Sequence, residues 1–138
     1  MKILILNGPN LNLQGKRESA IYGSLTFEAY LTELRASLPD HEIDYLQSNH
    51  EGVLIDALQQ APGRYDGVVL NGGGYTHSSV ALRDAVAAIP TPVVEVHISN
   101  IAAREEFRHT SLLTPVCRGA ILGLGLEGYR LACHFLTL

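Results

Sequence analysis

Cysteine and lysine are both scarce in this chain of 138 residues. The two cysteines, Cys117 and Cys133, form neither a metal-ligand spacing nor a disulfide framework, and we expect free thiols in a cytoplasmic protein. The two lysines are Lys2 and Lys16. A lysine that forms a Schiff base must be desolvated inside a pocket, whereas Lys2 precedes the first predicted strand. The sequence therefore argues against imine chemistry.

Long apolar runs and a basic charge balance are also lacking. No stretch reaches the roughly 18 apolar residues of a membrane-spanning helix. The formal net charge is −4, which argues against a nucleic acid or an anionic membrane as a partner. The sequence contains no metal-ligand set, so we expect no metal site. It also lacks the G-x-S-x-G motif of a nucleophilic serine.

Strand-like and helix-like segments alternate along the chain, whose length fits a single domain, residues 1–138. This alternation predicts an α/β fold of flavodoxin-like type, with a five-stranded parallel sheet in the order 2-1-3-4-5 and helices on both faces. The predicted strands are 2–6, 42–47, 67–70, 93–97 and 120–123, and the predicted helices are 26–38, 51–61, 79–88 and 126–136.

The first connection, about residues 7–25, is long for a compact domain. Connections above about 12–15 residues without secondary structure are usually functional. We predict a lid loop at about 12–25, with Gly15 and Gly23 as hinges.

Amide, hydroxyl and imidazole side chains follow three of the predicted strands, in segments 7–12, 71–77 and 97–100. Ligands of open α/β sheets bind past the carboxyl ends of the strands, so these segments are predicted to converge on one crevice. Amides and hydroxyls suit a polyhydroxylated ligand. The glycines at 72–74 match no phosphate-loop motif, and we interpret them as allowing a close approach of backbone to ligand.

Glu95 and His97 end the fourth predicted strand and, being two residues apart, should share one face of the sheet. A carboxylate beside an imidazole fixes its tautomer and favours its protonated form, which suits a general acid. The alternative is a core histidine paired with a glutamate that has no catalytic role.

Tyr22, in the first connection, is a candidate general base. A free phenol has a pKa near 10, and a base near pH 7 needs that pKa lowered by about 3. Guanidinium groups can lower it. Arg17 lies in the same segment, and Arg104 and Arg108, four residues apart, are expected to share one face of a helical turn. The alternative is a tyrosine packed on the surface, with arginines in solvated ion pairs.

Seven blocks carry a resemblance to a known family: residues 5–11 (ILNGPNL), 15–18 (GKRE), 22–23 (YG), 47–49 (QSN), 71–84 (NGGGYTHSSVALRD), 95–100 (EVHISN) and 104–109 (REEFRH). Together they make the chain resemble the type II 3-dehydroquinate dehydratases from end to end. The resemblance implies a hydro-lyase of the shikimate pathway that dehydrates 3-dehydroquinate to 3-dehydroshikimate through an enolate, without metal, cofactor or Schiff base.

The resemblance also assigns catalytic roles. It makes Tyr22 the base that removes the C2 proton, with Arg17 keeping it ionised. It makes His97 the acid that protonates the leaving C1 hydroxyl, with Glu95 orienting it. Asn10 is expected to hold a water that stabilises the enolate.

A second set of residues is implied to bind substrate. Asn71 and His77 are expected to bind substrate hydroxyls, and Ile98 and Ser99 to contact the substrate carboxylate. Arg108 is expected to contact the substrate from beyond the fourth strand.

The resemblance further implies a homo-oligomer, a dodecamer built from trimers. Arg104 is expected to belong with the lid, and Asp84 to be supplied to the site by a neighbouring subunit. No nucleic-acid or membrane partner is expected.

The chain departs from the family pattern at Ser19, where proline is usual, and at Gly72, where proline or alanine is more usual. Ala102 and Thr110 stand where histidines are frequent. Ser19 is expected to loosen the lid and Gly72 to add backbone freedom, without a change in the reaction.

Three other functions compete. A flavodoxin-type electron carrier needs a hydroxyl-rich phosphate loop, but no serine or threonine lies between Asn7 and Glu18. A phosphoacceptor receiver domain needs an aspartate where this chain has Asn71. A non-catalytic module that binds a polyol acid would share the amides without needing Tyr22, Arg17 and His97 together.

Overall fold

The computed structural model describes residues 1–15 and 25–138. Within these ranges, five strands form one parallel sheet in the order β2-β1-β3-β4-β5. The strands are β1 (Lys2–Asn7), β2 (Glu42–Gln47), β3 (Gly67–Asn71), β4 (Val93–His97) and β5 (Gly119–Leu122). This arrangement confirms the predicted flavodoxin-like sheet.

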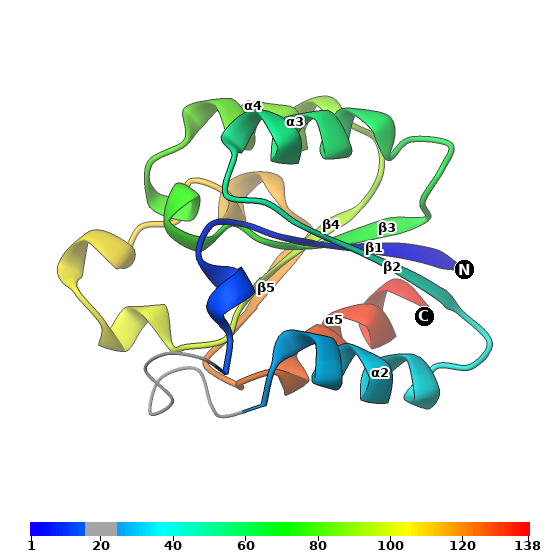
Figure 1. The fold of residues 1–138 in the computed structure, drawn as a ribbon. Helices are drawn as coiled ribbons and strands as arrows, with labels where there is room; N and C mark the ends of the chain where they lie inside the picture. Colours follow the sequence, from blue (N-terminus) through cyan, green and yellow to red (C-terminus); the bar gives the residue numbers. More distant parts are fainter. Residues whose placement is uncertain (16–24) are drawn as a thin grey trace.

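Helices cover both faces of the sheet, as predicted. Figure 1 shows α3 (Glu51–Gln60) and α4 (Val80–Ala88) on one face, and α2 (Phe27–Ser37) and α5 (Glu127–Leu136) on the other. Two of these helices begin at hydroxyl caps: the Thr26 side chain accepts from the backbone N–H of Ala29, and Ser79 accepts from that of Leu82.

The core forms two layers because successive strand residues point to opposite faces. Ile3 and Ile5 of β1 pack in the cluster under α2 and α5, which also contains Phe27 and Tyr129. The alternate residues of β1 pack in the other cluster, under α3 and α4. None of the helices among residues 1–15 and 25–138 is long and apolar enough to cross a bilayer.

The strand ends that carry the polar residues differ slightly from the prediction. β1 and β3 each extend one residue further, to Asn7 and Asn71, and these two residues are register partners. β5 ends at Leu122 rather than at Gly123, because Gly123 has a φ of 82° that takes it out of the strand. The two asparagines are thereby placed next to each other at the carboxyl edge of the sheet.

Candidate active site

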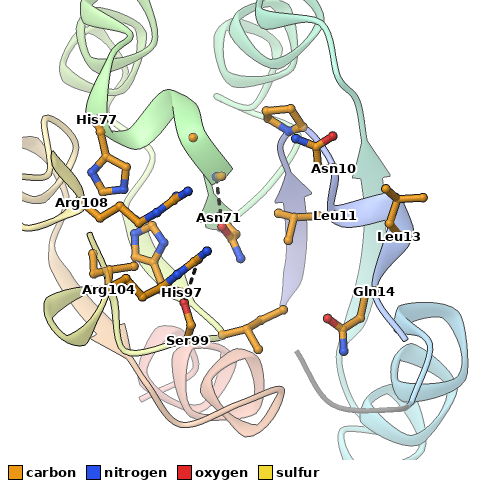
Figure 2. Close-up of a pocket in the computed structure, with 15 residues that line it drawn as sticks. Asn10, Leu11, Leu13, Gln14, Asn71, His77, His97, Ser99, Arg104 and Arg108 are labelled. Carbon is orange, nitrogen blue, oxygen red and sulfur yellow. Dashed lines mark hydrogen bonds between the residues drawn. The ribbon is translucent and has the colours of Figure 1, made fainter. Parts of the chain in front are cut away.

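A pocket lies at the carboxyl ends of β1, β3 and β4, where the three loops predicted to converge meet (Figure 2). Its position matches the switch point of this topology, between β1 and β3. The lining residues are Pro9, Asn10, Leu11, Leu13, Gln14, Asn71, Gly73, Gly74, His77, His97, Ile98, Ser99, Ile101, Arg104 and Arg108.

Glu95 and His97 lie side by side at the end of β4, which confirms the placement expected from their spacing. Nε2 of His97 donates to Oε2 of Glu95 over 2.5 Å, and both residues are buried. His97 also lines the pocket, whereas Glu95 lies behind it. Because Nε2 is occupied by Glu95, the nitrogen of His97 that remains for a ligand is Nδ1.

Two hydroxyl groups also donate to the buried carboxylate. Ser111 bonds Oε2 of Glu95 over 2.8 Å, and Thr114 bonds Oε1. Burial by itself would raise the pKa of Glu95, but the hydrogen bonds from His97, Thr114 and Ser111, together with the charge interaction with His97, outweigh it and hold that pKa below its usual value. Glu95 is therefore an ionised acceptor, which fixes the proton of His97 on Nε2.

Neither Ser111 nor Thr114 stands out in the sequence, because both follow the strand ends by many residues and belong to no repeated pattern. The signal that could have found them is Glu95 itself. A carboxylate placed on a buried strand needs several hydrogen-bond donors.

His77 stands beside His97, with ring centroids 6.3 Å apart and ring planes 23° from parallel. Nδ1 of His77 lies 2.8 Å from the backbone carbonyl oxygen of Thr110. A carbonyl can only accept, so Nδ1 carries the proton and Nε2 remains for a ligand. The two imidazoles therefore offer different ring nitrogens to one pocket.

Asn71 forms part of the pocket floor, and the protein itself uses much of its amide. Its Oδ1 accepts from the backbone N–H of Gly73 over 3.1 Å, and its Nδ2 donates to the hydroxyl of Tyr129 over 2.8 Å. The Tyr129 hydroxyl donates in turn to Oδ1 of Asn7 over 2.9 Å. Burial raises the pKa of Tyr129, which keeps it a neutral phenol. One N–H of Asn71 is left to bind a ligand.

The loop after β1 holds Asn10 against the pocket. Asn10 has a left-handed backbone with φ 69°, and its N–H donates to Oδ1 of Asn49 over 3.0 Å. Gln47 supports the same turn by donating to the carbonyl of Gly8 over 3.1 Å. The short 3-10 turn Leu11–Leu13 then follows within the segment expected to be irregular.

Gln14 is a pocket residue that the sequence does not single out. Its side chain is buried and donates to the carbonyl of Leu25 over 3.2 Å, which ties together the two sides of the predicted lid at its base. Tyr22 and Arg17, the predicted base and its cationic partner, lie outside the described residues, as does most of the lid expected at about 12–25.

The expected helical turn over Arg104 and Arg108 is wrong. Arg104 has an extended backbone (φ −102°, ψ −161°) between two short 3-10 turns, Ile101–Ala103 and Glu106–Arg108. This break places one carboxylate between the two arginines: Oε1 of Glu105 lies 3.7 Å from Nε of Arg104 and 3.0 Å from Nε of Arg108. Both arginines nevertheless line the same pocket.

The described part of this site contains no cluster of metal-ligating side chains. Among residues 1–15 and 25–138, no group of three histidine, cysteine, aspartate or glutamate side chains is placed to hold a metal ion. Cys117 and Cys133 are both free thiols, as expected. The chemistry that the described residues offer is proton transfer, hydrogen bonding by amides and hydroxyls, and the positive charge of two arginines.

The family model described as "Dehydroquinase class II" matches residues 1–137. The chain belongs to this family. It is 59% identical over 136 residues to the 3-dehydroquinate dehydratase of Bacillus pumilus (strain SAFR-032), covering 97% of this chain and 92% of that protein. It is 50% identical over 134 residues to that of Campylobacter jejuni subsp. jejuni serotype O:2, covering 96% of this chain and 84% of that protein.

Solved structures of class II dehydroquinases have the same fold. The type II dehydroquinase from Butyrivibrio crossotus DSM 2876 matches with a TM-score of 0.96 and 47% identity, covering 100% of this chain and 98% of that one. The enzyme from Propionibacterium acnes matches with a TM-score of 0.93 and 40% identity, covering 98% of this chain and 94% of that one. The resemblance read from the sequence is thereby confirmed.

Three further residues assigned from the class II dehydroquinase resemblance fall in different places. Ile98 and Ser99 line the pocket directly after β4, and the Ser99 hydroxyl accepts from Arg104 over 3.4 Å. Asp84 lies on α4, 61% exposed, paired with Arg83 and absent from the pocket lining. The single chain therefore does not bring Asp84 to the site.

Two adjacent glycines of this dehydroquinase, Gly72 and Gly73, differ in backbone conformation and in the atoms around them. Gly72 has an ordinary φ of −73°, so its backbone conformation does not require glycine. A Cβ there would lie 2.7 Å from Oγ1 of Thr76 and 2.9 Å from Cδ1 of Leu113, so a larger residue would require these side chains to shift. Gly73 has a φ of +57° and packs against Pro9, which permits the close turn at the pocket wall.

Proposed function

We propose that this class II dehydroquinase converts 3-dehydroquinate to 3-dehydroshikimate by removing a C2 proton and then expelling the C1 hydroxyl with acid assistance. The observation that carries the proposal is the buried Glu95–His97 pair, of which His97 lines the pocket at the switch point. The names of the relatives from Bacillus pumilus and Campylobacter jejuni support the choice of substrate.

His97 is the proposed acid. Glu95 accepts the Nε2 proton and stabilises positive charge on the ring, so Nδ1 can carry a second proton and deliver it to the C1 hydroxyl. The C1–O bond then breaks, the oxygen leaves as water, and His97 returns to its neutral form. The burial of Glu95 strengthens this interaction because few water molecules compete for the carboxylate.

Tyr22 is the proposed base, and Arg17 the cation that keeps it ionised, both on the strength of the family resemblance. The C2 proton lies next to a ketone, so its removal gives an enolate whose negative charge rests on the C3 oxygen. Asn10, at the pocket wall, is proposed to hold a water that donates to this oxygen.

Substrate binding is proposed to use the polar groups around these atoms. The free N–H of Asn71 and Nε2 of His77 suit substrate hydroxyls, because the remaining amide and imidazole atoms are held by the protein. Ile98 and Ser99 are proposed to bind the carboxylate, and Arg108 adds positive charge to the pocket lining.

Assembly is part of the proposal. We propose a homo-oligomer, a dodecamer of trimers, in which Asp84 of one subunit approaches the site of its neighbour and Arg104 acts with the lid. The exposure of Asp84 and its absence from the pocket lining of its own chain support this role. Light scattering tests the assembly. Asp84→Ala is expected to reduce turnover, and full activity in a monomer would contradict the proposal.

The reaction itself is tested by adding the purified protein to 3-dehydroquinate in the presence of EDTA and following the ultraviolet absorbance of the conjugated enone product. The assay is repeated after treatment with borohydride and substrate, which would trap an imine. Product formation that survives both treatments is expected. A folded protein that binds 3-dehydroquinate without making product would instead be a polyol-acid binding module.

A further inference from the structure

Residues 109–114, which we name the brace, bond His77 directly and bond Glu95, the partner of His97. The brace follows the arginine segment and is anchored to the loop after β3, because the N–H of Leu112 donates to the carbonyl of Thr76 over 2.9 Å. Its first residue, His109, also bonds the carbonyl of Arg104 through Nε2 over 3.1 Å. The brace is therefore tied to two of the loops that form the pocket.

One end of the brace acts on His97 through Glu95. The hydroxyl of Ser111 accepts from the N–H groups of Leu113 and Thr114, each over 3.1 Å, which directs its own proton to Glu95. Thr114 donates to the other carboxylate oxygen. Because both oxygens of Glu95 accept hydrogen bonds from hydroxyl groups, the carboxylate also acts as an acceptor toward His97. The imidazole proton of His97 is therefore held on Nε2.

The middle of the brace acts on His77 directly. The carbonyl oxygen of Thr110 receives the proton of Nδ1. His77 and His97 are thus given opposite tautomers by neighbouring residues of one segment, although the two rings lie nearly parallel in the same pocket.

We propose that the brace is a proton-positioning element: it sets opposite tautomers on His77 and His97, so that His97 presents Nδ1 as the acid while His77 presents Nε2 to the substrate. Ser111 and Thr114 are the positioning residues, since they act on the substrate only through Glu95. The inference rests on the proposed dehydration and adds to it the groups that prepare the acid.

The charged and titratable groups around Glu95 and His97 determine how turnover depends on pH. On the protein side, Cys117 interacts with Glu95, and burial together with this charge raises the pKa of Cys117 to about 12, so the thiol stays neutral. On the pocket side, His97 faces His77, Arg104 and Arg108. Removing a hydroxyl donor from Glu95 changes none of these groups.

The test compares Thr114→Val, which keeps the side-chain shape but removes the donor, with Thr114→Ser, which keeps the donor. Thr32→Val is the matched control, because the Thr32 hydroxyl bonds only a carbonyl within its own helix, on the exposed side of α2. Turnover of 3-dehydroquinate is measured across pH for each protein, together with thermal unfolding.

For Thr114→Val we expect kcat to fall about tenfold with KM nearly unchanged, since a hydrogen bond to a charged group is lost behind the acid. The low-pH limb of kcat should move to higher pH because the carboxylate is less stabilised. Thr114→Ser and Thr32→Val should behave as the wild type. A wild-type kcat and pH profile in Thr114→Val would overturn the proposal, as would a loss that Thr114→Ser does not restore.

A second measurement needs no variant. Long-range ¹H–¹⁵N correlation spectra of the histidine-labelled wild type, at alkaline pH, report which ring nitrogen carries the proton. The proposal requires Nε2–H on His97 and Nδ1–H on His77, and the same tautomer on both would overturn it. Absence of turnover in the wild type would contradict the proposed function, whereas the tautomers would still test the brace.

Discussion

Tyr129 connects the core to the site, and removing its hydroxyl provides a quantitative test of this connection. The side chain is fully buried on α5, and its hydroxyl bridges Asn71 and Asn7 over 2.8 and 2.9 Å. Tyr129→Phe keeps the ring, including its edge contact with Phe27 at a centroid distance of 4.9 Å. The substitution therefore removes hydrogen bonds with little change in packing.

The expected loss of stability is about 3 kcal/mol, from two lost hydrogen bonds of about 1 kcal/mol each and from polar groups of Asn7 and Asn71 left buried without a partner. Urea unfolding at one fixed protein concentration measures this loss, since oligomers unfold in a concentration-dependent way. The KM for 3-dehydroquinate should also rise, because the Asn71 amide loses one of the two bonds that orient it.

Tyr30→Phe is the matched control. Tyr30 is buried in the same cluster, but its hydroxyl bonds neither asparagine. Its expected loss is below about 1 kcal/mol, without a change in KM. Equal losses in the two variants would refute the reasoning, because they would show that the Tyr129 bridge contributes nothing beyond a buried phenol.

Two further predictions concern packing and pH. Gly8→Ala should cost about 2 kcal/mol in urea unfolding, since its Cβ would lie 2.6 Å from the carbonyl oxygen of Gly72, a backbone atom that cannot move alone. Gly119→Ala, where a Cβ meets no atom within 4 Å, should change stability by less than about 0.5 kcal/mol, and similar losses in both variants would contradict this account. The lowered pKa of Glu95 means that its ionisation stabilises the fold above the ordinary carboxyl value of 4.5, and that this stability is lost as the pH falls through the folded-state pKa. The melting temperature of the wild type should therefore fall towards that of Glu95→Gln on going from pH 6 to about pH 3, whereas a constant difference between the two proteins would show that Glu95 does not titrate as described.

The parts of the fold that the sequence predicts well are those set by local periodicity. The strand and helix segments follow from alternating and 3-4 patterns of apolar residues, and the Glu95–His97 pair follows from a spacing of two on a strand. The crevice follows in turn from the sheet topology, because the carboxyl ends of parallel strands lie at one edge.

The parts that the sequence does not predict depend on long-range contacts or on local breaks in regular structure. Tyr129 donates a hydrogen bond to Asn7, which lies 122 positions away in the sequence, and no local sequence pattern predicts such a bond. Arg104 and Arg108 have helical spacing, but the extended backbone at Arg104 breaks the turn. The side chains of Thr76 and Leu113 lie close to Gly72, a contact that only the tertiary structure reveals.

In the proposed reaction, His97 delivers the proton that allows the C1 hydroxyl to leave, after Tyr22 has removed the C2 proton. Its most direct test is His97→Ala in deuterated water, with NMR following both hydrogen exchange at C2 of 3-dehydroquinate and the appearance of product. We expect enzyme-dependent exchange at C2 with dehydration nearly abolished, and neither process in Tyr22→Phe. Dehydration by His97→Ala at the wild-type rate would show that another group is the acid.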